Sequence, residues 1–454
     1  MGPPDAPTLS ALSDIVGSRH VVTDPEVLAG SSVDWTGRFT GTTPALVRPG
    51  STEEVAGVVA LCRQRGLPVT LQGGNTGLVG GGVPLSGELL VSLSRLDSVS
   101  IDERAGQATA GAGCTIGDLQ RAAERRSWTY GVDLGSRDSA TVGGTIATNA
   151  GGLRMVRYGD TRSQVVGVEA VLGTGAVVSH LSGLLKDNTG YHLPGLLAGS
   201  EGTLGVVTAA RLRLAVVPRF WATALLAFDG PEDAVGAALA MRRHLPSLEA
   251  VELFFAEGVE LVCSVRALRP PFDRSYRAYL LVESAALTDP TEEMVEALAD
   301  VGGVADSAMA IEPARRAELW QYRELHTEAV NTLGPPHKMD VTLPGGNLAG
   351  FAAEIPDRVR GIAPDARVFL WGHVADGNLH VNVVGVPPDD ESVDEAVYRA
   401  AVEAGGSISA EHGIGTVKRQ WLHWCRSESE IAAFRAIKRA LDPDGILSPN
   451  VLLP

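Results

Sequence analysis

The sequence predicts an α+β protein of more than one domain. The chain has 454 residues, and a single hydrophobic core seldom grows beyond about 250–300 residues. From residue 45 to 217, short aliphatic runs alternate with helical stretches and glycine loops, which is typical of α+β or α/β layers. Two strand–helix–strand passages follow. We therefore expect a first domain over 1–217, a second over 218–425, and a C-terminal segment over 426–454 that packs back on the first domain.

The elements of the first domain follow from local patterns. SALSDIVG and DPEVLAG predict a short helical entry over 1–40, and ALVRP at 45–49 begins the strand pattern. TIGDLQRAAERR at 115–126 predicts a helix. Further strands are expected within VTLQGG, ELLVSLSRL and VVGVEAVLGTGAVV, at 69–74, 88–96 and 165–178.

The second domain contains two similar passages. The first is TALLAF, PEDAVGAALAMRRH and LEAVELFF, and the second is RAYLLVES, PTEEMVEALAD and DSAMAIE. In each, we place proline at the first helical position with acidic residues in the first turn, as helix starts prefer. Two such units predict a ferredoxin-like sheet covered by helices. The tail SESEIAAFRAIKRALDPDGILSPNVLLP predicts an amphipathic helix that ends at a Pro/Gly turn.

The charge and composition exclude several classes of function. With 38 basic and 54 acidic side chains the formal charge is −16, so nucleic acid is an unfavourable partner, and an anionic substrate would need a local cationic cluster. Four widely spaced cysteines without a CxxC pair argue against a thiolate metal or iron–sulfur site. The N-terminus lacks the features of a signal peptide, and no apolar run approaches eighteen residues. We expect a cytoplasmic protein without a membrane span.

Three segments are rich in glycine and small residues. LPVTLQGGNTGLVGGGVP at 67–84 contains six glycines, which suit either a backbone cradle for a pyrophosphate or a tight hairpin turn. It is neither a Walker loop nor a GxGxxG that opens a helix. The segments at 133–175 and 199–208 also contain many small residues. Three such segments together indicate backbone that lies against a flat ligand.

Three of the ten histidines fall in WGHVADGNLHVN (371–382) and SAEHGIGTVKR (409–419). A hairpin-like loop between His373 and His380 can bring their imidazoles together, and with the Glu411 carboxylate they would form a three-ligand site with open positions. Such a set suits Zn²⁺, Mn²⁺ or Fe²⁺. Asn382 shares a strand face with His380 and can reach the same ligand. A lone histidine is more often a hydrogen-bonded core or surface residue, and we interpret the other histidines in that way.

The local cationic cluster is expected within ELWQYRELHTEAVNTLGPPHKMDVTLP at 318–344. Arg323 and Thr327 have the i, i+4 spacing of one helical face, and Lys338 follows a Gly-Pro-Pro turn on a strand. A guanidinium, a hydroxyl and an ammonium group that converge could bind a carboxylate. The alternative for Arg323 is a solvated helix face.

The order of these motifs carries a resemblance that covers nearly the entire chain. GGNTG, TVGGTIATNAGG and GSEGTLGVVT, in this order, resemble the FAD-binding domain of the vanillyl-alcohol oxidase type flavoproteins. GHxxDGNLHxN and SAEHGIG resemble their D-2-hydroxyacid dehydrogenase branch, which includes D-lactate and D-2-hydroxyglutarate dehydrogenases. The resemblance implies a two-subdomain FAD-binding domain, followed by a substrate or cap domain that carries the metal site.

The resemblance also implies which residues contact FAD. The residues expected at the pyrophosphate are Gly73, Gly74, Asn75, Thr76 and Gly77. Those expected along the middle of the flavin are Ser139, Thr141, Gly144, Asn149 and Gly152, and those along the nucleotide are Gly202, Thr203 and Val207. Some relatives attach FAD through a histidine at the position of Asn75. Because no histidine occurs here between His20 and His180, we expect non-covalent FAD.

By the same resemblance, the expected activity is oxidation of a D-2-hydroxyacid to the 2-oxoacid by hydride transfer to FAD. His412 would be the general base, while His373, His380 and Glu411 would hold a divalent metal, with zinc the first choice. RExxT and KxDVxLP resemble the D-2-hydroxyglutarate dehydrogenase subgroup, which assigns substrate binding to Arg323, Thr327, Lys338 and Asn382 and favours a dicarboxylate. Ala375 departs from the glycine common in the family loop.

Two other functions remain open from the sequence. One is a D-lactate or glycolate dehydrogenase of the same fold, and the other is a non-catalytic flavin-binding subunit of an electron-transfer complex. For the enzyme, the expected electron acceptor is electron-transfer flavoprotein or a quinone, with dioxygen as a further alternative. A homodimer is the one assembly considered.

Overall fold

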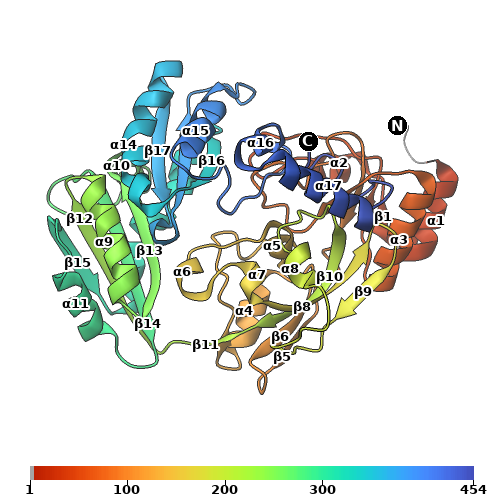
Figure 1. Ribbon diagram of the computed structural model, residues 1–454, viewed down its shortest axis with the longest axis horizontal. Coiled ribbons are helices and arrows are strands. Elements are labelled where there is room, and N and C mark those ends of the chain that lie inside the picture. Colours follow the sequence, from red (N-terminus) through yellow and green to blue (C-terminus); the bar gives the residue numbers. More distant parts are fainter. Residues whose placement is uncertain (1–4) are drawn as a thin grey trace. The chain divides into compact units, whose positions relative to one another are not determined.

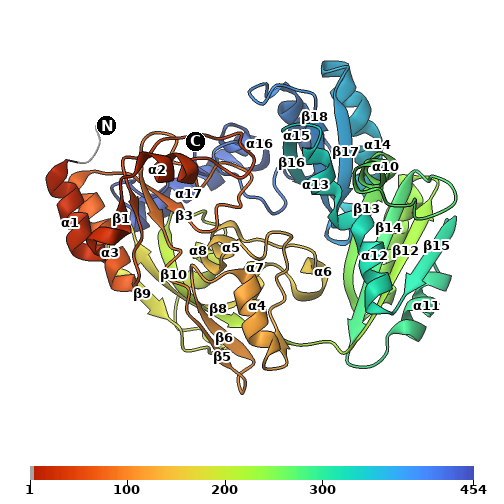
Figure 2. The same ribbon diagram turned by 180° about the vertical axis from the view of Figure 1, so that it is seen from behind.

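The computed structural model describes residues 5–454 and divides the chain into two compact units (Figures 1 and 2). The first contains the residues up to Gly151, Gly159–Val216 and Glu411–Pro454. The second contains Gly152–Tyr158 and Val217–Ala410. The chain passes from the first unit to the second after Val216 and returns after Ala410, and the expected domain bounds at 217 and 425 stay predictions. Within the described part of the chain, no helix is long and apolar enough to cross a membrane.

The first unit is built around two larger sheets and one two-stranded ribbon. A four-stranded sheet has the order β1-β2-β4-β3, with strands Val21–Val22, Leu46–Val47, Leu89–Ser92 and Val69–Gln72. A five-stranded antiparallel sheet has the order β5-β6-β10-β8-β9, with strands Val99–Asp102, Gln107–Gly111, Gly205–Arg213, Val165–Leu172 and Val177–His180. β7 (Trp128–Thr129) pairs with β11 (Ala215–Val216). The strands expected within 69–74, 88–96 and 165–178 are confirmed, although the first two are shorter than those segments and the third contains β8 and the start of β9.

The helices of the first unit begin and end at ordinary capping signals. Ser51 accepts from the Glu54 N–H to start α3, and Gly66 ends it with a left-handed backbone. Thr115 caps α4, which confirms the helix expected at 115–126. The helices are α1 Ala6–Val16, α2 Pro25–Ser31, α3 Thr52–Arg65, α4 Ile116–Glu124, α5 Val142–Thr148, α7 Thr161–Gln164, α8 Leu193–Leu197, α16 Leu422–Cys425 and α17 Glu428–Leu441. In α17, Ser427 and Glu430 form a capping box.

The second unit contains a seven-stranded antiparallel sheet of order β15-β12-β14-β13-β17-β18-β16. Its strands are β12 Phe220–Phe228, β13 Leu248–Phe255, β14 Ala278–Ala286, β15 Asp306–Ala310, β16 His337–Thr342, β17 Arg367–Gly372 and β18 Asn378–Val384. The four strands of the two strand–helix–strand passages lie in the order fourth, first, third, second. This antiparallel βαββαβ arrangement confirms the ferredoxin-like expectation. The three remaining strands extend the same sheet beyond β13.

Helices cover both faces of this sheet. Figure 1 shows α9 in front of the strands, and Figure 2 shows α12 in front of the opposite face. α14 packs against α9 and α15, while α10 packs against α12 and α13. The helices are α9 Pro231–His244, α10 Ala256–Arg266, α11 Thr291–Ala299, α12 Pro313–Glu324, α13 His326–Asn331, α14 Gly345–Ile362 and α15 Ser392–Glu403.

Two details of these helices differ from the sequence expectation. Pro231 is the first residue of α9 as expected, but Pro290 is the cap that precedes α11. The helix expected to carry both Arg323 and Thr327 is also wrong, because α12 ends at Glu324 and α13 begins at His326. The two residues therefore belong to consecutive helices rather than to one continuous helical face.

The short segment Gly152–Tyr158 belongs to the second unit through a buried carboxylate on β13. Glu249 accepts a hydrogen bond from the Tyr158 hydroxyl at 3.3 Å and lies 3.6 Å from Arg154 Nε. Burial raises the pKa of Glu249 to about 7. The helical turn α6 (Met155–Tyr158) is thereby held on the sheet.

We expect Leu280→Ala to destabilise the second unit by about 2–5 kcal/mol, because Leu280 is 0 % exposed in the centre of the sheet. Leu287, just beyond the same strand, is 55 % exposed, and Leu287→Ala should change stability by less than about 0.5 kcal/mol. Denaturant unfolding of both variants measures the difference. Equal unfolding midpoints would contradict the placement of Leu280 in the core.

Candidate active site

The first two glycine segments of the first unit lie directly against each other. A Cβ atom built on Gly73 would overlap the Thr141 hydroxyl, and one built on Gly74 would overlap the backbone carbonyl of Ser139. Only glycine fits at both positions, because well-packed atoms cannot overlap in this way. Segments about 65 residues apart in the chain thus form one packed cluster.

Two asparagines in these segments have a left-handed backbone. Asn75 has φ 53° and Asn149 has φ 55°, a conformation in which asparagine is the usual alternative to glycine. The Asn75 side-chain amide donates to the Val33 carbonyl at 2.8 Å. The Asn149 amide donates to the Asp160 carboxylate at 2.8 Å, and its oxygen accepts from the Arg162 N–H at 2.8 Å. Their side chains therefore fasten the loops, and each backbone turns sharply beside them.

The third segment contacts the other two. The Gly199 N–H donates to the Ile146 carbonyl at 2.9 Å, and the Glu201 N–H donates to the Ala147 carbonyl at 2.8 Å, which ties this segment to α5. A Cβ on Gly202 would lie 2.9 Å from Leu71 Cδ1, in the strand before Gly73. All three segments singled out in the sequence therefore meet within the first unit.

Glu201 is a residue that the sequence interpretation missed. Its carboxylate accepts hydrogen bonds from the backbone N–H groups of Ile414 at 2.8 Å and Gly415 at 2.7 Å. Burial raises the pKa of Glu201, while these two hydrogen bonds lower it. Glu201 thus fixes the loop that directly follows His412. The signal was an acidic residue inside a run of small residues, GSEGT.

These loops fit FAD. Beside the packed Gly73 and Gly74, a Cβ built on Gly77 would meet no heavy atom within 4 Å. The backbone is therefore accessible there to a phosphate, which N–H groups in a glycine loop can bind. Val207, on β10, is buried, and the Thr203 carbonyl accepts from Lys438 Nζ at 2.7 Å. Gly152 belongs to the second unit. The individual FAD contacts, Thr76 and Gly144 included, stay predictions.

In the second unit, β17 and β18 form the hairpin expected between the two histidines. The turn η2 (Val374–Asp376) joins the strands, and Gly377 closes it with φ 86°. The imidazole ring centroids of His373 and His380 lie 5.3 Å apart, with ring planes at 89°. Ala375, the departure from the family loop, is buried, and its carbonyl accepts from Arg242 at 2.9 Å. The substitution is therefore accommodated in an ordered turn.

The neighbouring strand β16 supplies a polar row on the same face of the sheet. Asp340 pairs directly opposite His380, and Lys338 directly opposite Asn382. Cross-strand partners point to one face, and so do residues two apart in a strand. Lys338, Asp340, His380 and Asn382 therefore form a compact polar group, which confirms that His380 and Asn382 share a face. His380 Nδ1 lies 3.3 Å from Asp340 Oδ1.

His373 has its own carboxylate partner, Glu252 of β13. His373 Nδ1 lies 2.5 Å from Glu252 Oε1, and Arg323 Nε donates to Glu252 Oε2 at 2.7 Å. Arg323 is 6 % exposed and Glu252 is 0 % exposed. Arg323, which we expected at the substrate, is thus ion-paired behind His373. The sequence interpretation missed Glu252.

The donor set suits a divalent cation. Two imidazoles whose ring nitrogens lie within 4.8 Å of each other provide two ligands, and a carboxylate stands at Nδ1 of each ring. Such partners orient metal-binding histidines in known sites. Imidazole ligands are compatible with zinc, manganese or iron, so the identity of the metal stays a prediction.

Lys338 is the cation of this polar group. Burial lowers its pKa to about 8. An ammonium group with this pKa is mostly protonated at neutral pH and can attract an anion. Thr327 is half-buried on α13. The roles of both residues in substrate binding stay predictions.

The segment that directly precedes Glu411 and His412 is hydrogen-bonded to β16. Ser407 and Thr342 exchange backbone hydrogen bonds at 2.8 and 3.2 Å, and the Ala410 N–H donates to Asp340 Oδ2 at 3.0 Å. Glu411 and His412 are the first residues after the chain returns to the first unit. Their roles as ligand and base stay predictions.

Two of the remaining histidines, His326 and His337, are buried in the core of the second unit. His326 is fully buried against Phe254 and Trp371, and burial lowers its pKa to about 3, so its imidazole is neutral. His337 lies on the opposite face of β16 and bonds Asp394 at 2.5 Å. Both match the interpretation of isolated histidines as core residues.

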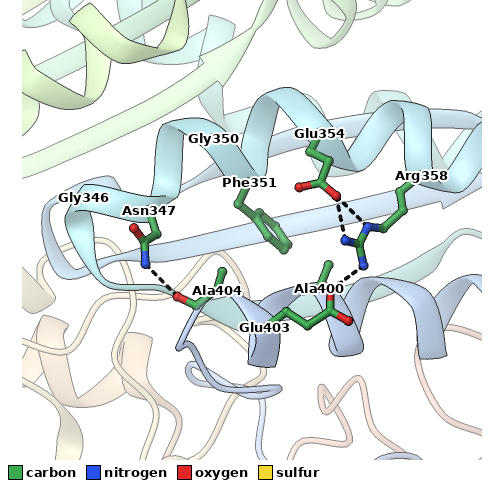
Figure 3. Close-up of a pocket in the computed structure, with 9 residues that line it drawn as sticks. All are labelled: Gly346, Asn347, Gly350, Phe351, Glu354, Arg358, Ala400, Glu403 and Ala404. Atoms are coloured by element: carbon green, nitrogen blue, oxygen red, sulfur yellow. Dashed lines mark hydrogen bonds and ion pairs between the residues drawn. The ribbon is translucent and has the colours of Figure 1, made fainter.

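A surface pocket of the second unit lies between α14 and α15 (Figure 3). Arg358 is ion-paired there with Glu354 and Glu403, at 2.7 and 2.8 Å. The Asn347 amide donates to the Ala404 carbonyl at 2.9 Å. None of the residues that line this pocket was expected at the site, and its charged groups satisfy one another.

Comparison with known proteins identifies the family. Residues 217–452 match the family described as "FAD linked oxidases, C-terminal domain", and residues 43–180 match "FAD binding domain". The chain belongs to the FAD-linked oxidases. This FAD-linked oxidase begins to match the C-terminal family at residue 217, where the larger segment of its second compact unit also begins.

Two relatives show how far the similarity extends. The chain is 37 % identical to "D-2-hydroxyglutarate dehydrogenase" of Xanthomonas citri pv. viticola, over 98 % of this chain and 97 % of that protein. It is also 37 % identical to "D-2-hydroxyglutarate dehydrogenase, mitochondrial" of Bos taurus, over 98 % of this chain and 83 % of that protein. These matches confirm the expected membership of the vanillyl-alcohol oxidase type and the similarity to its D-2-hydroxyglutarate dehydrogenases.

Solved structures share the fold at lower identity. P-cresol methylhydroxylase has a TM-score of 0.79 at 15 % identity, covering 99 % of this chain and 97 % of that chain. 4-Ethylphenol oxidase from Gulosibacter chungangensis has a TM-score of 0.78 at 19 % identity, covering 100 % and 99 %. The expected α+β fold class, with an FAD-binding domain and a C-terminal domain, is confirmed.

Gly74→Ala should reduce FAD retention, because its Cβ would overlap the Ser139 carbonyl and push the first two glycine segments apart. Gly30→Ala is the control, since a Cβ there meets nothing within 4 Å. Flavin absorbance per polypeptide after desalting measures the effect, and we expect at least about a tenfold loss of affinity, or about 1.4 kcal/mol, for the first variant alone. Equal retention in both variants would contradict this role of Gly74.

Proposed function

We propose that this FAD-linked oxidase is an FAD- and divalent-metal-dependent dehydrogenase of D-2-hydroxyacids, with D-2-hydroxyglutarate or a similar dicarboxylate as the substrate. The observation that supports it most is the polar row of the second unit, in which His373 and His380 stand together beside Lys338 and Asn382. Relatives that match over nearly the full length bear the name D-2-hydroxyglutarate dehydrogenase. The proposal joins this chemistry to that similarity.

The side chains have separate roles in the proposal. His373, His380 and Glu411 hold the cation, and the Asn382 amide binds the substrate next to them. The Lys338 ammonium group attracts the carboxylate far from the reacting carbon, with the Thr327 hydroxyl beside it. Arg323 adds positive charge behind His373. The metal ion is one cationic position and the Lys338 ammonium group is a second. This arrangement favours a dicarboxylate over D-lactate or glycolate, because the shorter acids lack the second anionic group.

His412 is the general base in this proposal. An imidazole has an ordinary pKa near 6.5 and accepts a hydroxyl proton efficiently near neutral pH. When bound, FAD would accept the hydride from the substrate's α-carbon and the divalent cation would polarise the hydroxyl oxygen. Glu201 holds the backbone directly after His412 and so limits where this imidazole can move.

The proposal also covers the cofactor, the electron acceptor, the assembly and the metal. FAD is non-covalent, because Asn75 stands where some relatives carry the linking histidine. Electron-transfer flavoprotein or a quinone is the proposed electron acceptor, a homodimer the proposed assembly, and the cytoplasm the proposed location. The metal is zinc in this proposal, with manganese or iron as the alternatives.

Anaerobic titration of the purified flavoprotein with hydroxyacids tests the activity. We expect D-2-hydroxyglutarate to bleach the flavin spectrum at substoichiometric to stoichiometric amounts, while L-2-hydroxyglutarate leaves it unchanged. D-lactate and glycolate are the matched short acids. Equal reduction by D-lactate would refute the preference for a dicarboxylate, and no reduction by any D-hydroxyacid would refute the dehydrogenase.

The pH dependence of substrate binding tests Lys338. Its pKa is lowered to about 8 by burial, so the ammonium charge is present below pH 8 and is lost as the pH rises through 8. The KM for D-2-hydroxyglutarate should therefore rise above pH 8, by about tenfold per pH unit at most. Lys338→Arg should flatten this rise, because arginine stays protonated. A KM rise that persists unchanged in the arginine variant would exclude Lys338 as its source.

A further inference from the structure

Behind His373, three side chains from three different elements form a buried chain of hydrogen bonds. His373 Nδ1 lies 2.5 Å from Glu252 Oε1, and the Arg323 guanidinium donates from Nε to Glu252 Oε2 at 2.7 Å. Glu252 comes from the ferredoxin-like half of the sheet and Arg323 from the end of α12. Each carboxylate oxygen thus serves one donor.

We propose that Glu252 is a positioning residue that sets the tautomer of His373, and that Arg323 fixes the Glu252 carboxylate in place through its second oxygen. This inference rests on the proposed metal-dependent function and adds Glu252, to which that function assigns no role. Because the proton of the neutral imidazole is held on Nδ1, its lone pair lies on Nε2, where a divalent cation binds. The arrangement prepares the ligand before the metal arrives.

The burial of the pair explains why an arginine stands there. Glu252 is 0 % exposed and Arg323 is 6 % exposed, so an isolated carboxylate at this position would be strongly disfavoured. The guanidinium supplies the compensating charge and a fixed hydrogen bond. A lysine at 323 would place a point charge on a flexible stem, and it would hold the carboxylate less rigidly.

The same sheet contains a matched pair that touches no histidine of the polar row. Glu283 is 5 % exposed on β14, and Arg316, seven residues before Arg323 on α12, donates to it at 2.8 Å. Thr223 and Trp320 also donate to Glu283, at 2.7 and 2.8 Å. Removing this carboxylate perturbs an equivalent buried ion pair and leaves the His373 Nδ1 partner in place. Glu283→Gln is therefore the structural control.

Glu252→Gln changes hydrogen-bond chemistry while preserving shape. A carboxylate accepts from two donors, whereas an amide offers one oxygen and one NH₂ group. The charged Arg323 is the stronger donor and should take the oxygen, so the NH₂ group would face His373 Nδ1. The imidazole would then carry its proton on Nε2, where the metal must bind. Divalent metal affinity should fall about 10–100-fold.

The experiment measures Zn²⁺ and Co²⁺ affinity of the FAD-loaded protein by competition with a chromophoric chelator. We expect wild type and Glu283→Gln to agree within about twofold, Glu252→Gln to be weaker by about 10–100-fold, and Arg323→Lys to lie between them. Equal affinities for wild type and Glu252→Gln would overturn the inference. If wild type itself binds neither ion, the metal in the proposed function is refuted, and the next measurement still decides the tautomer.

NMR of the protein labelled with ¹⁵N-histidine and stripped of metal reads the tautomer directly, with His373→Gln to assign the signal. We expect the His373 proton on Nδ1 in wild type and in Glu283→Gln, and on Nε2 in Glu252→Gln. A proton on Nε2 in wild type would overturn the inference even if Glu252→Gln failed to fold. This readout does not depend on activity, so it separates the inference from the proposed function.

Discussion

Two carboxylates in the centre of a sheet, Glu252 and Glu283, impose the constraint on which the second unit depends. Both are buried, and a charge removed from water costs several kcal/mol unless a partner of opposite charge compensates it. Arg316 and Arg323, seven residues apart on α12, supply that partner for each. The register of α12 on the sheet is therefore set by charge as well as by apolar packing. Shifting the helix by one residue would take both arginines away from these carboxylates.

This constraint links the ferredoxin-like half of the sheet to the histidine hairpin. β13 carries Glu252 and pairs with β17, so a carboxylate of the ferredoxin-like strands stands behind the imidazole of His373. On the other side, β16 places Asp340 opposite His380. The imidazole of His373 is thus hydrogen-bonded to β13 and that of His380 lies beside Asp340 of β16, within one continuous sheet. A sheet is a stiff support, and groups that it carries keep their geometry better than groups on loops.

The sequence predicted what depends on local pattern. The hairpin between His373 and His380 follows from an alternating strand, a turn with Asp-Gly-Asn and another strand, and the two βαβ passages follow from caps and periodicity. Glu252 could not be found in this way, because it lies 121 residues from His373 in the chain and appears in LEAVELFF as an ordinary polar position. The break between α12 and α13 was also missed. It lies next to His326, whose packing against Phe254 and Trp371 comes from distant strands.

The glycine segments also depend on contacts between distant parts of the chain, which local sequence patterns do not predict. Their order in the chain carried the resemblance, but the reason for each glycine is a contact with a different segment, such as Gly74 with Ser139. Glu201 was passed over because its partners, Ile414 and Gly415, lie more than two hundred residues away.

The position of β16 at the end of the seven-stranded sheet has a consequence for solubility. An outermost strand offers unsatisfied backbone groups to any other extended chain. Here Thr342 already exchanges backbone bonds with Ser407, and Asp340 takes the Ala410 N–H through its side chain. The returning chain therefore pairs with the last residue of this edge strand. A second chain therefore cannot pair with the backbone of Thr342, where the returning chain already lies.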